Sequence, residues 1–303
     1  MASVAPNQLA EIRAGTNGSV HAVLSAARPR QWSKNLLLLA GIIFAAKLDD
    51  GLRWIEAATA VLVYCAAPSS AYLLNDVVDA DRDRRHPVKG LRPVARGDVT
   101  PRAALAAAAA LVAVAIVAAA TLGISSVALL LAFLSLQLAY TLRLKHVVLI
   151  DVMVIAALFV MRAVAGAVAV DVRISPWLLV CTGLLALFLA LGKRRAELVL
   201  AGEDSPGWSV LSEYSLPLVD QLVTIVASAT VISYSVYTFT ARDSKAMMAT
   251  IPFVLFGVFR YLLLIHRRGF GEEPESVLLG DVHIQATVVV WAATAALILS
   301  AGL

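Results

Sequence analysis

An amide and four carboxylates stand together where a long apolar run of this chain ends, in the segment NDVVDADRD at residues 75–83. At 100° per residue, four of these side chains share one face of a helix within an arc of about 100°. They belong to Asn75, Asp76, Asp79 and Asp83. Asp81 points away, at about 240° from Asn75. The spacing therefore predicts a face of oxygen donors with one acid left outside it.

Carboxylates gathered on one face repel one another unless a cation neutralises them. Carboxylate and amide oxygens are hard ligands of the kind that Mg²⁺ prefers, and Mg²⁺ usually keeps several waters and shares its coordination with substrate phosphates. We therefore predict a Mg²⁺ site that holds a diphosphate. Because the segment follows an apolar run, this site is expected at a membrane surface.

The composition identifies the class of protein. The chain has 303 residues, of which 60% are hydrophobic and only 15% are charged. Soluble domains are nearer 45–50% apolar and about 25% charged. The expected fold is an all-α integral membrane protein with nine transmembrane helices, at roughly 33–48, 54–75, 101–121, 124–142, 148–169, 175–192, 216–239, 247–265 and 284–302.

The 25 Lys and Arg residues are unevenly placed with respect to these spans. Most of them lie in the N-terminal segment up to Lys34, in the 76–102 connection, or at positions 143, 145, 193–195 and 267–268. By the positive-inside rule, the N-terminus and the acidic segment are expected on the cytoplasmic side of the plasma (inner) membrane. Thr100 and Pro101 are typical of a helix start, with Thr at the N-cap.

Three further groups of charges are candidates for binding anions. Before the first span, Arg28, Arg30 and Trp32 are typical of an interfacial anchor, whereas Lys34 stands against apolar residues and favours a phosphate contact. Around the fifth span, Tyr140, Arg143 and Lys145 precede Asp151 and the intramembrane Arg162. Arg143 and Lys145 either bind substrate or only set the membrane topology, whereas Asp151 and Arg162 favour a functional role. Asp151 and Arg162 share a helix face but lie about 16.5 Å apart, too far to pair.

The basic triplet at residues 193–195 ends the sixth span. Such a triplet is common at the cytoplasmic end of a transmembrane helix, but Lys193 and Arg194 would also suit a substrate with several phosphates. Arg162 is open to two interpretations in the same way, because an intramembrane Arg indicates a functional site by default yet can also form a structural pair with Asp151 of a neighbouring protomer or with a carbonyl oxygen.

The motif Asn75-Asp76-x-x-Asp79-x-x-x-Asp83, placed after the second of nine spans, resembles that of the UbiA-type intramembrane prenyltransferase superfamily. The resemblance covers residues 28–303, with 1–27 as a cytoplasmic N-terminal segment. It implies nine helices around a central cavity that opens laterally to lipid and is capped by cytoplasmic loops. Most members carry a second Asp-rich motif after the sixth helix, so that two Mg²⁺ ions hold a prenyl diphosphate.

At that second place this chain reads LGKRRAE over residues 191–197, which is basic where the superfamily is acidic. Together with the segment RPRQWSKN at 28–35 and the 140–162 stretch, this is similar to one branch, the decaprenyl-phosphate phosphoribosyltransferases. The resemblance implies transfer of 5-phosphoribose from phosphoribosyl diphosphate to a polyprenyl phosphate, with release of diphosphate, for cell-wall arabinan synthesis. No nucleic acid is expected as a partner, and a homo-oligomer is compatible with the sequence.

The resemblance also implies roles for individual residues. Asn75, Asp76, Asp79 and Asp83 would bind Mg²⁺, and Asp76, Asp79, Asp83 and Asp151 would be the catalytic carboxylates. The expected substrate-binding residues are Lys34, Asn75, Arg82, Lys89, Arg92, Tyr140, Arg143, Lys145, Arg162, Lys193 and Arg194. Two alternatives remain open from the sequence. One is an aromatic prenyltransferase that uses a prenyl diphosphate, and the other is a cation-coupled transporter.

Overall fold

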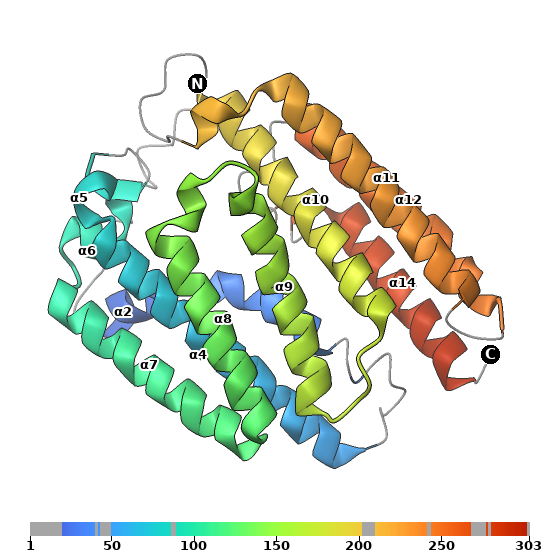
Figure 1. Cartoon of the computed structure of the whole chain (residues 1–303), viewed down its shortest axis with the longest axis horizontal. Coiled ribbons are helices and arrows are strands. Elements are labelled where there is room, and N and C mark those ends of the chain that lie inside the picture. Colours follow the sequence, from blue (N-terminus) through green and yellow to red (C-terminus); the bar gives the residue numbers. More distant parts are fainter. Residues whose placement is uncertain are drawn as a thin grey trace. The chain divides into compact units, whose positions relative to one another are not determined.

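The regular structure of the described residues consists of helices. The computed structural model describes residues 20–39, 42, 50–85, 89–201, 210–240, 244–267, 277 and 280–301 (Figure 1). The chain divides into two compact units, which are described separately. Unit 1 comprises residues 1–32 and 62–118, and unit 2 comprises residues 33–61 and 119–303.

Unit 1 carries the acidic segment. Its helices are α2 (Val20–Ala26), the later part of α4 (Gly51–Val78), α5 (Ala80–Asp83), the 3₁₀ turn η2 (Lys89–Leu91), α6 (Pro93–Arg96) and most of α7 (Pro101–Thr121). The short helix α6 packs against both α2 and α5. A small cluster of buried apolar residues, including Leu73, Val94 and Val99, joins α4 to the α6–α7 region. These contacts fix the segment that follows α4.

The start of α7 follows the predicted capping pattern. The hydroxyl of Thr100 accepts a hydrogen bond from the backbone N–H of Ala103 at 3.2 Å, as an N-cap side chain does. Pro101 is the first helical residue, where its missing N–H costs nothing. The connection between α4 and α7 therefore ends at Thr100, the N-cap of α7.

Unit 2 contains a series of long helices in which each packs against the next along the chain. They are α8 (Ile124–Leu142), α9 (Ile150–Ala169), α10 (Pro176–Ala201), α11 (Leu216–Thr240), α12 (Ile251–Arg267) and α14 (Val282–Ser300). Short 3₁₀ turns are η3 (Leu144–His146), η4 (Leu211–Glu213) and η5 (Ala246–Thr250). Most of η1 (Pro29–Leu39) also belongs to unit 2.

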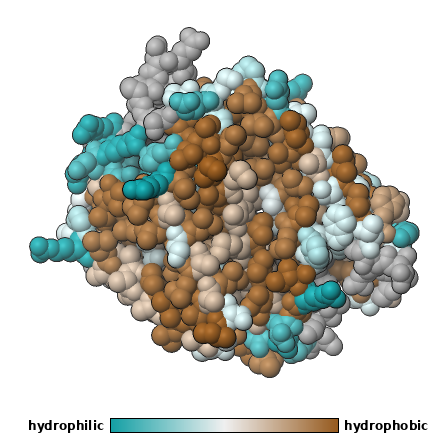
Figure 2. Space-filling model, viewed as in Figure 1, coloured by the Kyte–Doolittle hydropathy of each residue, from teal (hydrophilic) through white to brown (hydrophobic). Residues whose placement is uncertain are grey.

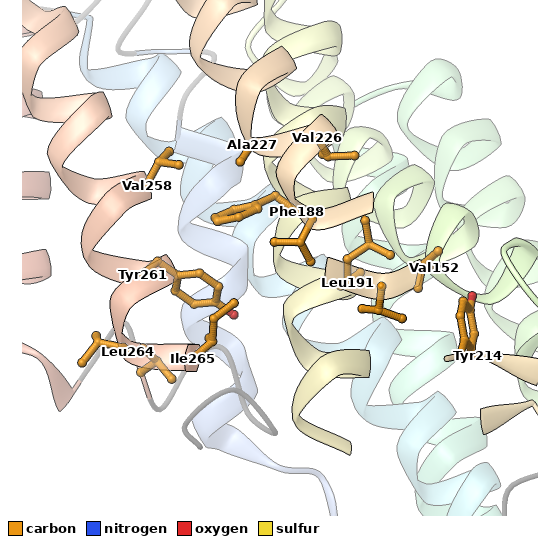
Figure 3. Packing of buried hydrophobic residues seen from close by; sticks show 14 of the residues in the cluster. Val152, Phe188, Leu191, Tyr214, Val226, Ala227, Val258, Tyr261, Leu264 and Ile265 are labelled. Atoms are coloured by element: carbon orange, nitrogen blue, oxygen red, sulfur yellow. The ribbon is translucent and has the colours of Figure 1, made fainter. Parts of the chain in front are cut away.

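The main core of unit 2 lies between α9, α10, α11 and α12 (Figure 3). Phe188 of α10 and Tyr261 of α12 meet edge to face, with ring centroids 5.2 Å apart. Gly192 faces the Tyr261 hydroxyl, which would lie 2.9 Å from a Cβ at that position. Small residues thus let these helices approach closely, the usual means of packing where lipid supplies no hydrophobic drive between helices.

The contact between η1 and α9 shows the same principle. A Cβ on Gly166 would lie 2.0 Å from the carbonyl oxygen of Leu38, so no larger residue fits there without a shift of the backbone. The buried side of α9 is rich in small residues, among them Ala163, Ala165 and Ala167. The backbone of η1 therefore lies directly on α9.

Eight helices of the described residues are long and apolar enough to cross a membrane: 51–78, 101–121, 124–142, 150–169, 176–200, 216–240, 246–267 and 282–300. They correspond to eight of the nine predicted spans. The remaining one, 33–48, falls partly on residues outside those described, as does most of the N-terminal segment 1–27. Figure 2 shows mainly hydrophobic residues on the visible sides of the long helices, with hydrophilic residues gathered over α5 and α6.

Candidate active site

The acidic segment continues the hydrogen bonding of α4 beyond its last residue. The N–H of Asp79 donates to the carbonyl of Asn75 at 2.9 Å, and the N–H of Asp83 donates to that of Asp79 at 2.8 Å. The chain therefore keeps close to helical periodicity through residue 83, as the predicted shared face requires. Asp76 and Asp83 are buried. The side chain of Asp81 is 86% exposed, which confirms that it lies off that face.

Two arginines of unit 1 neutralise the buried acids. Arg28 donates from Nη2 to Asp76 Oδ1. Arg92 bridges two carboxylates, with Nη1 2.6 Å from Asp83 Oδ2 and 3.4 Å from Asp76 Oδ1. Because the side chain of Asp76 is only 2% exposed, its charge would be costly without these partners. Of the predicted phosphate ligands in this unit, Arg92 is thus joined to the acids.

Arg28 is the residue that the sequence did not assign to this site, since the pattern around it was typical of an interfacial anchor. The segment that carries it is tied to α4, because Ser69 Oγ donates to the carbonyl of Ala27 at 2.8 Å and accepts from Trp32 Nε1 at 3.1 Å. Arg28 also lies over the ring of Tyr72, 4.7 Å from its centroid. Its backbone is left-handed, with φ 55°. Ser69, Tyr72 and Asp76 recur at helical spacing, so one face of α4 receives this segment.

The donors of the acidic segment agree in kind with a divalent cation. Asp76 Oδ2 is buried and finds no hydrogen-bond partner among the residues that the structure describes. An oxygen of that type suits Mg²⁺. Within the same residues, however, no group of three or more His, Cys, Asp or Glu side chains is arranged to hold a metal ion. The assignment of Asn75, Asp76, Asp79 and Asp83 as Mg²⁺ ligands therefore stays a prediction.

The other predicted ligands of unit 1 lie within the acidic segment or on the turn that follows it. Arg82, in α5, has an exposed side chain, whereas Lys89 in η2 is partly buried. Gly90 lies close to the backbone of Asp83 and Arg84, so the η2 turn returns toward α5. Arg82 therefore stands within the acidic segment, and Lys89 stands on the turn that returns toward it.

Unit 2 contains a second polar constellation, centred on a fully buried carboxylate. Asp151, in the first turn of α9, has 0% exposure. Its Oδ2 accepts from Arg194 Nε at 2.6 Å, and its Oδ1 accepts from the Tyr214 hydroxyl at 2.7 Å. Tyr140 lies within electrostatic reach of the Arg194 side chain. The structure thus brings together three predicted residues, Tyr140, Asp151 and Arg194, and adds Tyr214.

Each member of the basic triplet lies near an acidic side chain, and Lys193 and Arg194 share Glu197. Arg194 Nη1 also donates to Glu197, which lies one turn on. Lys193 Nζ is 3.9 Å from Glu197 Oε1, and its side chain is 42% exposed. Arg195 donates to Asp220 Oδ1 at 2.7 Å and to the carbonyl of Ile265 at 2.9 Å. Lys193 is therefore the most accessible of the three, while Arg194 is held by two carboxylates.

Arg162 lies inside a span and has polar partners on η1 and α9. Its Nε donates to Asn35 Oδ1 at 3.2 Å, and its Nη1 donates to the carbonyl of Leu158 at 3.3 Å. The guanidinium also lies over the rings of Phe133 and Phe159, 4.9 and 5.3 Å from their centroids. The carbonyl contact agrees with the structural interpretation left open by the sequence. Asn35 lies next to Lys34, so Arg162 holds the side chain of the residue beside this predicted phosphate ligand.

Arg143 and Lys145 lie on the connection between α8 and α9. Arg143 follows the last residue of α8 and is exposed, and Lys145 lies in η3 with partial exposure. Their side chains are accessible enough to meet an anion. The residues that the sequence missed in this unit are Tyr214 and Glu197, for which no motif gave a signal.

Comparisons with known proteins agree with the fold. The model of the UbiA prenyltransferase family matches residues 36–277. The chain is 33% identical to decaprenyl-phosphate phosphoribosyltransferase of Mycolicibacterium smegmatis, over 91% of either chain. It is 33% identical to the protein of that name from Mycobacterium tuberculosis, over 91% of this chain and 93% of the relative.

Among solved structures, a UbiA homologue from Archaeoglobus fulgidus, bound to GPP and Mg²⁺, matches with a TM-score of 0.72 and 17% identity. The match covers 92% of this chain and 99% of the homologue. The extent of the family match and the similarity of the curated relatives lead to one conclusion: the chain belongs to the UbiA prenyltransferase family.

Proposed function

We propose that the protein transfers 5-phosphoribose from phosphoribosyl diphosphate to decaprenyl phosphate and releases diphosphate, in the synthesis of cell-wall arabinan precursors. The observation that carries this proposal is the 33% identity to decaprenyl-phosphate phosphoribosyltransferases over 91% of this chain. The solved homologues share only the fold at 17% identity or less, and therefore do not choose between substrates.

The charges of the site residues support this choice of donor and acceptor. Phosphoribosyl diphosphate carries a diphosphate and a separate 5-phosphate, and the lipid acceptor carries a further phosphate. The chain has one acidic segment, in unit 1, and a basic triplet where most of the superfamily has a second acidic motif. One metal-binding motif together with several cations matches these substrates better than a prenyl diphosphate and a neutral aromatic ring.

In this proposal the acidic segment binds the diphosphate end of the donor through a divalent cation. Bound Mg²⁺ would neutralise the charge that develops on the departing diphosphate. Asp76 offers the buried Oδ2 to the cation, and Asn75, Asp79 and Asp83 complete the proposed donor set. Arg28 and Arg92, which pair with Asp76 and Asp83, would balance the remaining carboxylate charge.

The acceptor needs little activation. A phosphate monoester is already largely ionised at pH 7, because its second pKa is about 6. One of its oxygens can therefore attack the anomeric carbon as the bond to the diphosphate breaks, without a strong general base. Lys34, Lys89 and Lys193 are the proposed partners of the 5-phosphate and of the lipid phosphate, together with Arg143 and Lys145. Keeping the prenyl chain in lipid avoids a cost of about 0.8 kcal/mol for each CH₂ exposed to water.

The proposal includes an arrangement in the membrane. The 33–48 segment would form a ninth span, and the helices would surround a cavity that opens to lipid beneath cytoplasmic loops. The distribution of Lys and Arg favours the cytoplasmic side of the plasma membrane for the acidic segment. Single cysteines introduced at Arg82 and at Asp171 should be labelled from opposite sides of sealed vesicles. Labelling of both from one side would contradict the orientation.

The activity is tested with purified protein, radiolabelled phosphoribosyl diphosphate, decaprenyl phosphate and Mg²⁺. A labelled lipid should form, together with one diphosphate for each transfer. A prenyltransferase would instead consume a prenyl diphosphate and leave the ribosyl donor unused, and a transporter would take up solute into proteoliposomes without a covalent product. Either of these results would overturn the proposal.

The metal assignment has a matched pair of variants. Asp79→Ala should lower turnover at least about 100-fold, because removing a carboxylate from a metal site weakens both the binding of the cation and the stabilisation of the leaving group. Asp81→Ala removes an exposed acid two residues away and should keep most of the activity. Equal activity of the two variants would show that the metal site lies elsewhere.

A further inference from the structure

Tyr214 connects a loop to the beginning of α9 through a single hydroxyl group. It lies between η4 and α11, at one end of the main core of unit 2 near Val152 (Figure 3). Its hydroxyl donates to Asp151 Oδ1 at 2.7 Å and accepts from the backbone N–H of Leu149 at 2.8 Å. One side chain therefore holds two successive parts of another segment, the last residue before α9 and the first turn of that helix.

The backbone that Tyr214 holds is strained. Leu149, just before α9, has φ 65° and ψ −40°, a conformation that residues with a side chain rarely adopt. Strain of this kind persists only where the surroundings enforce it, and it gathers at functional sites. The hydrogen bond from Leu149 to Tyr214 supplies such a constraint. This hydrogen bond fixes the backbone direction in which the connection that carries Arg143 and Lys145 enters α9.

The same hydroxyl completes a network of balanced charges. Asp151 has Arg194 on one oxygen and Tyr214 on the other, and Arg194 also holds Glu197. Both oxygens of Asp151 are thus engaged by protein groups, which favours a positioning role over direct contact with a ribose hydroxyl. Glu197 is paired with Arg194, and this weakens the electrostatic attraction between Glu197 and the more exposed Lys193, which lies 3.9 Å away.

Tyr214 is suited to act as a permanent donor. Burial, followed by the hydrogen bond to Asp151, raises the pKa of the Tyr214 hydroxyl above its ordinary value. The hydroxyl therefore stays protonated across the physiological range and keeps its bond to the carboxylate.

We infer that Tyr214 is a positioning residue for the anionic substrates: it fixes the connection between α8 and α9, with Arg143 and Lys145, and it anchors the Asp151–Arg194 pair beside Lys193. This inference rests on the proposed function. Tyr214 itself is held inside the network and contacts no reacting atom in this scheme. Its hydroxyl sets where these cations stand, and hence how tightly a phosphate is bound.

A first experiment tests the structural part without any substrate. Hydrogen exchange of the 143–150 peptide is compared between the wild type, Tyr214→Phe and a control, Tyr234→Phe. The control also removes a buried hydroxyl with two partners, because Tyr234 bonds to Thr250 at 2.7 Å and to Trp291 at 2.8 Å. Tyr214→Phe should speed exchange of this peptide roughly tenfold, whereas Tyr234→Phe should leave it unchanged. No change in Tyr214→Phe, or an equal change in both variants, would overturn the inference.

A second experiment tests the functional part by steady-state kinetics. Tyr214→Phe should raise the KM of the ribosyl donor or of the lipid phosphate roughly fivefold, the order expected for one lost hydrogen bond, with kcat changed less than about twofold. Tyr234→Phe should alter neither KM. A fall in kcat alone, or unchanged KM values for both substrates, would contradict a positioning role.

Relief of the backbone strain provides a rescue. Leu149→Gly added to Tyr214→Phe should recover part of the lost affinity, because glycine adopts a positive φ without the constraint that the hydroxyl supplied. If Tyr214→Phe does not fold alone, the double variant replaces it in both experiments, and failure of the Leu149→Gly substitution to restore either folding or affinity counts against the inference. A wild type that makes no labelled lipid refutes the proposed function, whereas the exchange experiment still decides whether Tyr214 orders the connection.

Discussion

Arg28 and Asp76, 48 residues apart in the sequence, form an ion pair in which the carboxylate is almost fully buried. The pair exists because the 27–32 segment lies along one face of α4, where Ser69 and Tyr72 also contact it. An arginine that resembles a membrane anchor in the sequence is thereby placed at the acidic segment. Its removal provides a sharp test of that placement.

Arg28→Met should lower the stability of the detergent-solubilised protein by about 1–3 kcal/mol, because Asp76 would keep only its longer contact to Arg92. The thermal midpoint of unfolding gives the comparison. Arg84→Met is the control, since it removes a surface pair with the exposed Asp81 and one hydrogen bond to the Ala95 carbonyl, while no buried carboxylate loses a partner. A smaller loss for Arg28→Met than for Arg84→Met would mean that Asp76 does not depend on this partner.

Asp76→Asn should weaken the binding of Mn²⁺, a paramagnetic substitute for Mg²⁺, by at least about tenfold, because it removes charge from the proposed metal ligand. Electron paramagnetic resonance counts free and bound Mn²⁺ directly and needs no turnover. Asp81→Asn serves as the comparison, with the same chemical change at an exposed position. Unaltered Mn²⁺ affinity in Asp76→Asn would remove Asp76 from the metal site.

Asp151 and Arg194 should show strong coupling in a double-mutant cycle. Asp151→Asn and Arg194→Gln each leave a buried charge with a lost partner, at a cost of about 3–5 kcal/mol. The double variant should lose less stability than the sum of the two single variants, because both charges of the pair have been removed together. Additive losses in unfolding experiments would show that the 2.6 Å contact contributes no coupling energy.

Arg162→Lys should behave as a disruptive change although it conserves the charge. Lysine cannot reach Asn35 and the Leu158 carbonyl with one planar group, nor can it stack on Phe133 and Phe159 in the same way. The expected result is a lower thermal midpoint and faster hydrogen exchange in residues 33–39. Arg173→Lys, which changes a residue in the α9–α10 connection, should leave both unchanged. Wild-type exchange in Arg162→Lys would indicate that Asn35 is held by other contacts.

The start of α14 should depend on acid in a defined range. Asp281 accepts from Ile284 N at 3.0 Å and pairs with Arg260 at 2.8 Å. The hydrogen bond from Arg260 is the main cause that lowers the pKa of Asp281 to about 2. A carboxylate with a depressed pKa stabilises the folded state above its unfolded value of about 3.9, and this contribution is lost as the pH falls toward 2.

The test is the thermal midpoint of the wild type and of Asp281→Asn between pH 6 and pH 2, a span set by the pKa of about 2 and the unfolded value of about 3.9. Asparagine keeps the N-cap but lacks the charge that faces Arg260. The difference between the two proteins should be constant above about pH 5 and shrink below about pH 4. A difference that grows as the pH falls would contradict the assignment of the shift to Asp281.

Local patterns in the sequence predicted much of what the structure contains. Eight of the spans follow from the length and apolar character of their segments, and the N-cap at Thr100 follows from residue types next to each other. The exposure of Asp81 follows from the helical period alone. These features depend on neighbours within one or two turns, so the sequence by itself determines them.

Only the tertiary structure decided the partners of the buried charges. Asp76 with Arg28, Arg194 with Asp151, and Asp151 with Tyr214 join residues 43 to 63 positions apart. No periodicity encodes such pairs, because they depend on which helix faces meet and how closely their backbones approach. A buried charge must find a partner, so its presence in the sequence predicted that a pair would exist, while packing alone selected which residue would supply it.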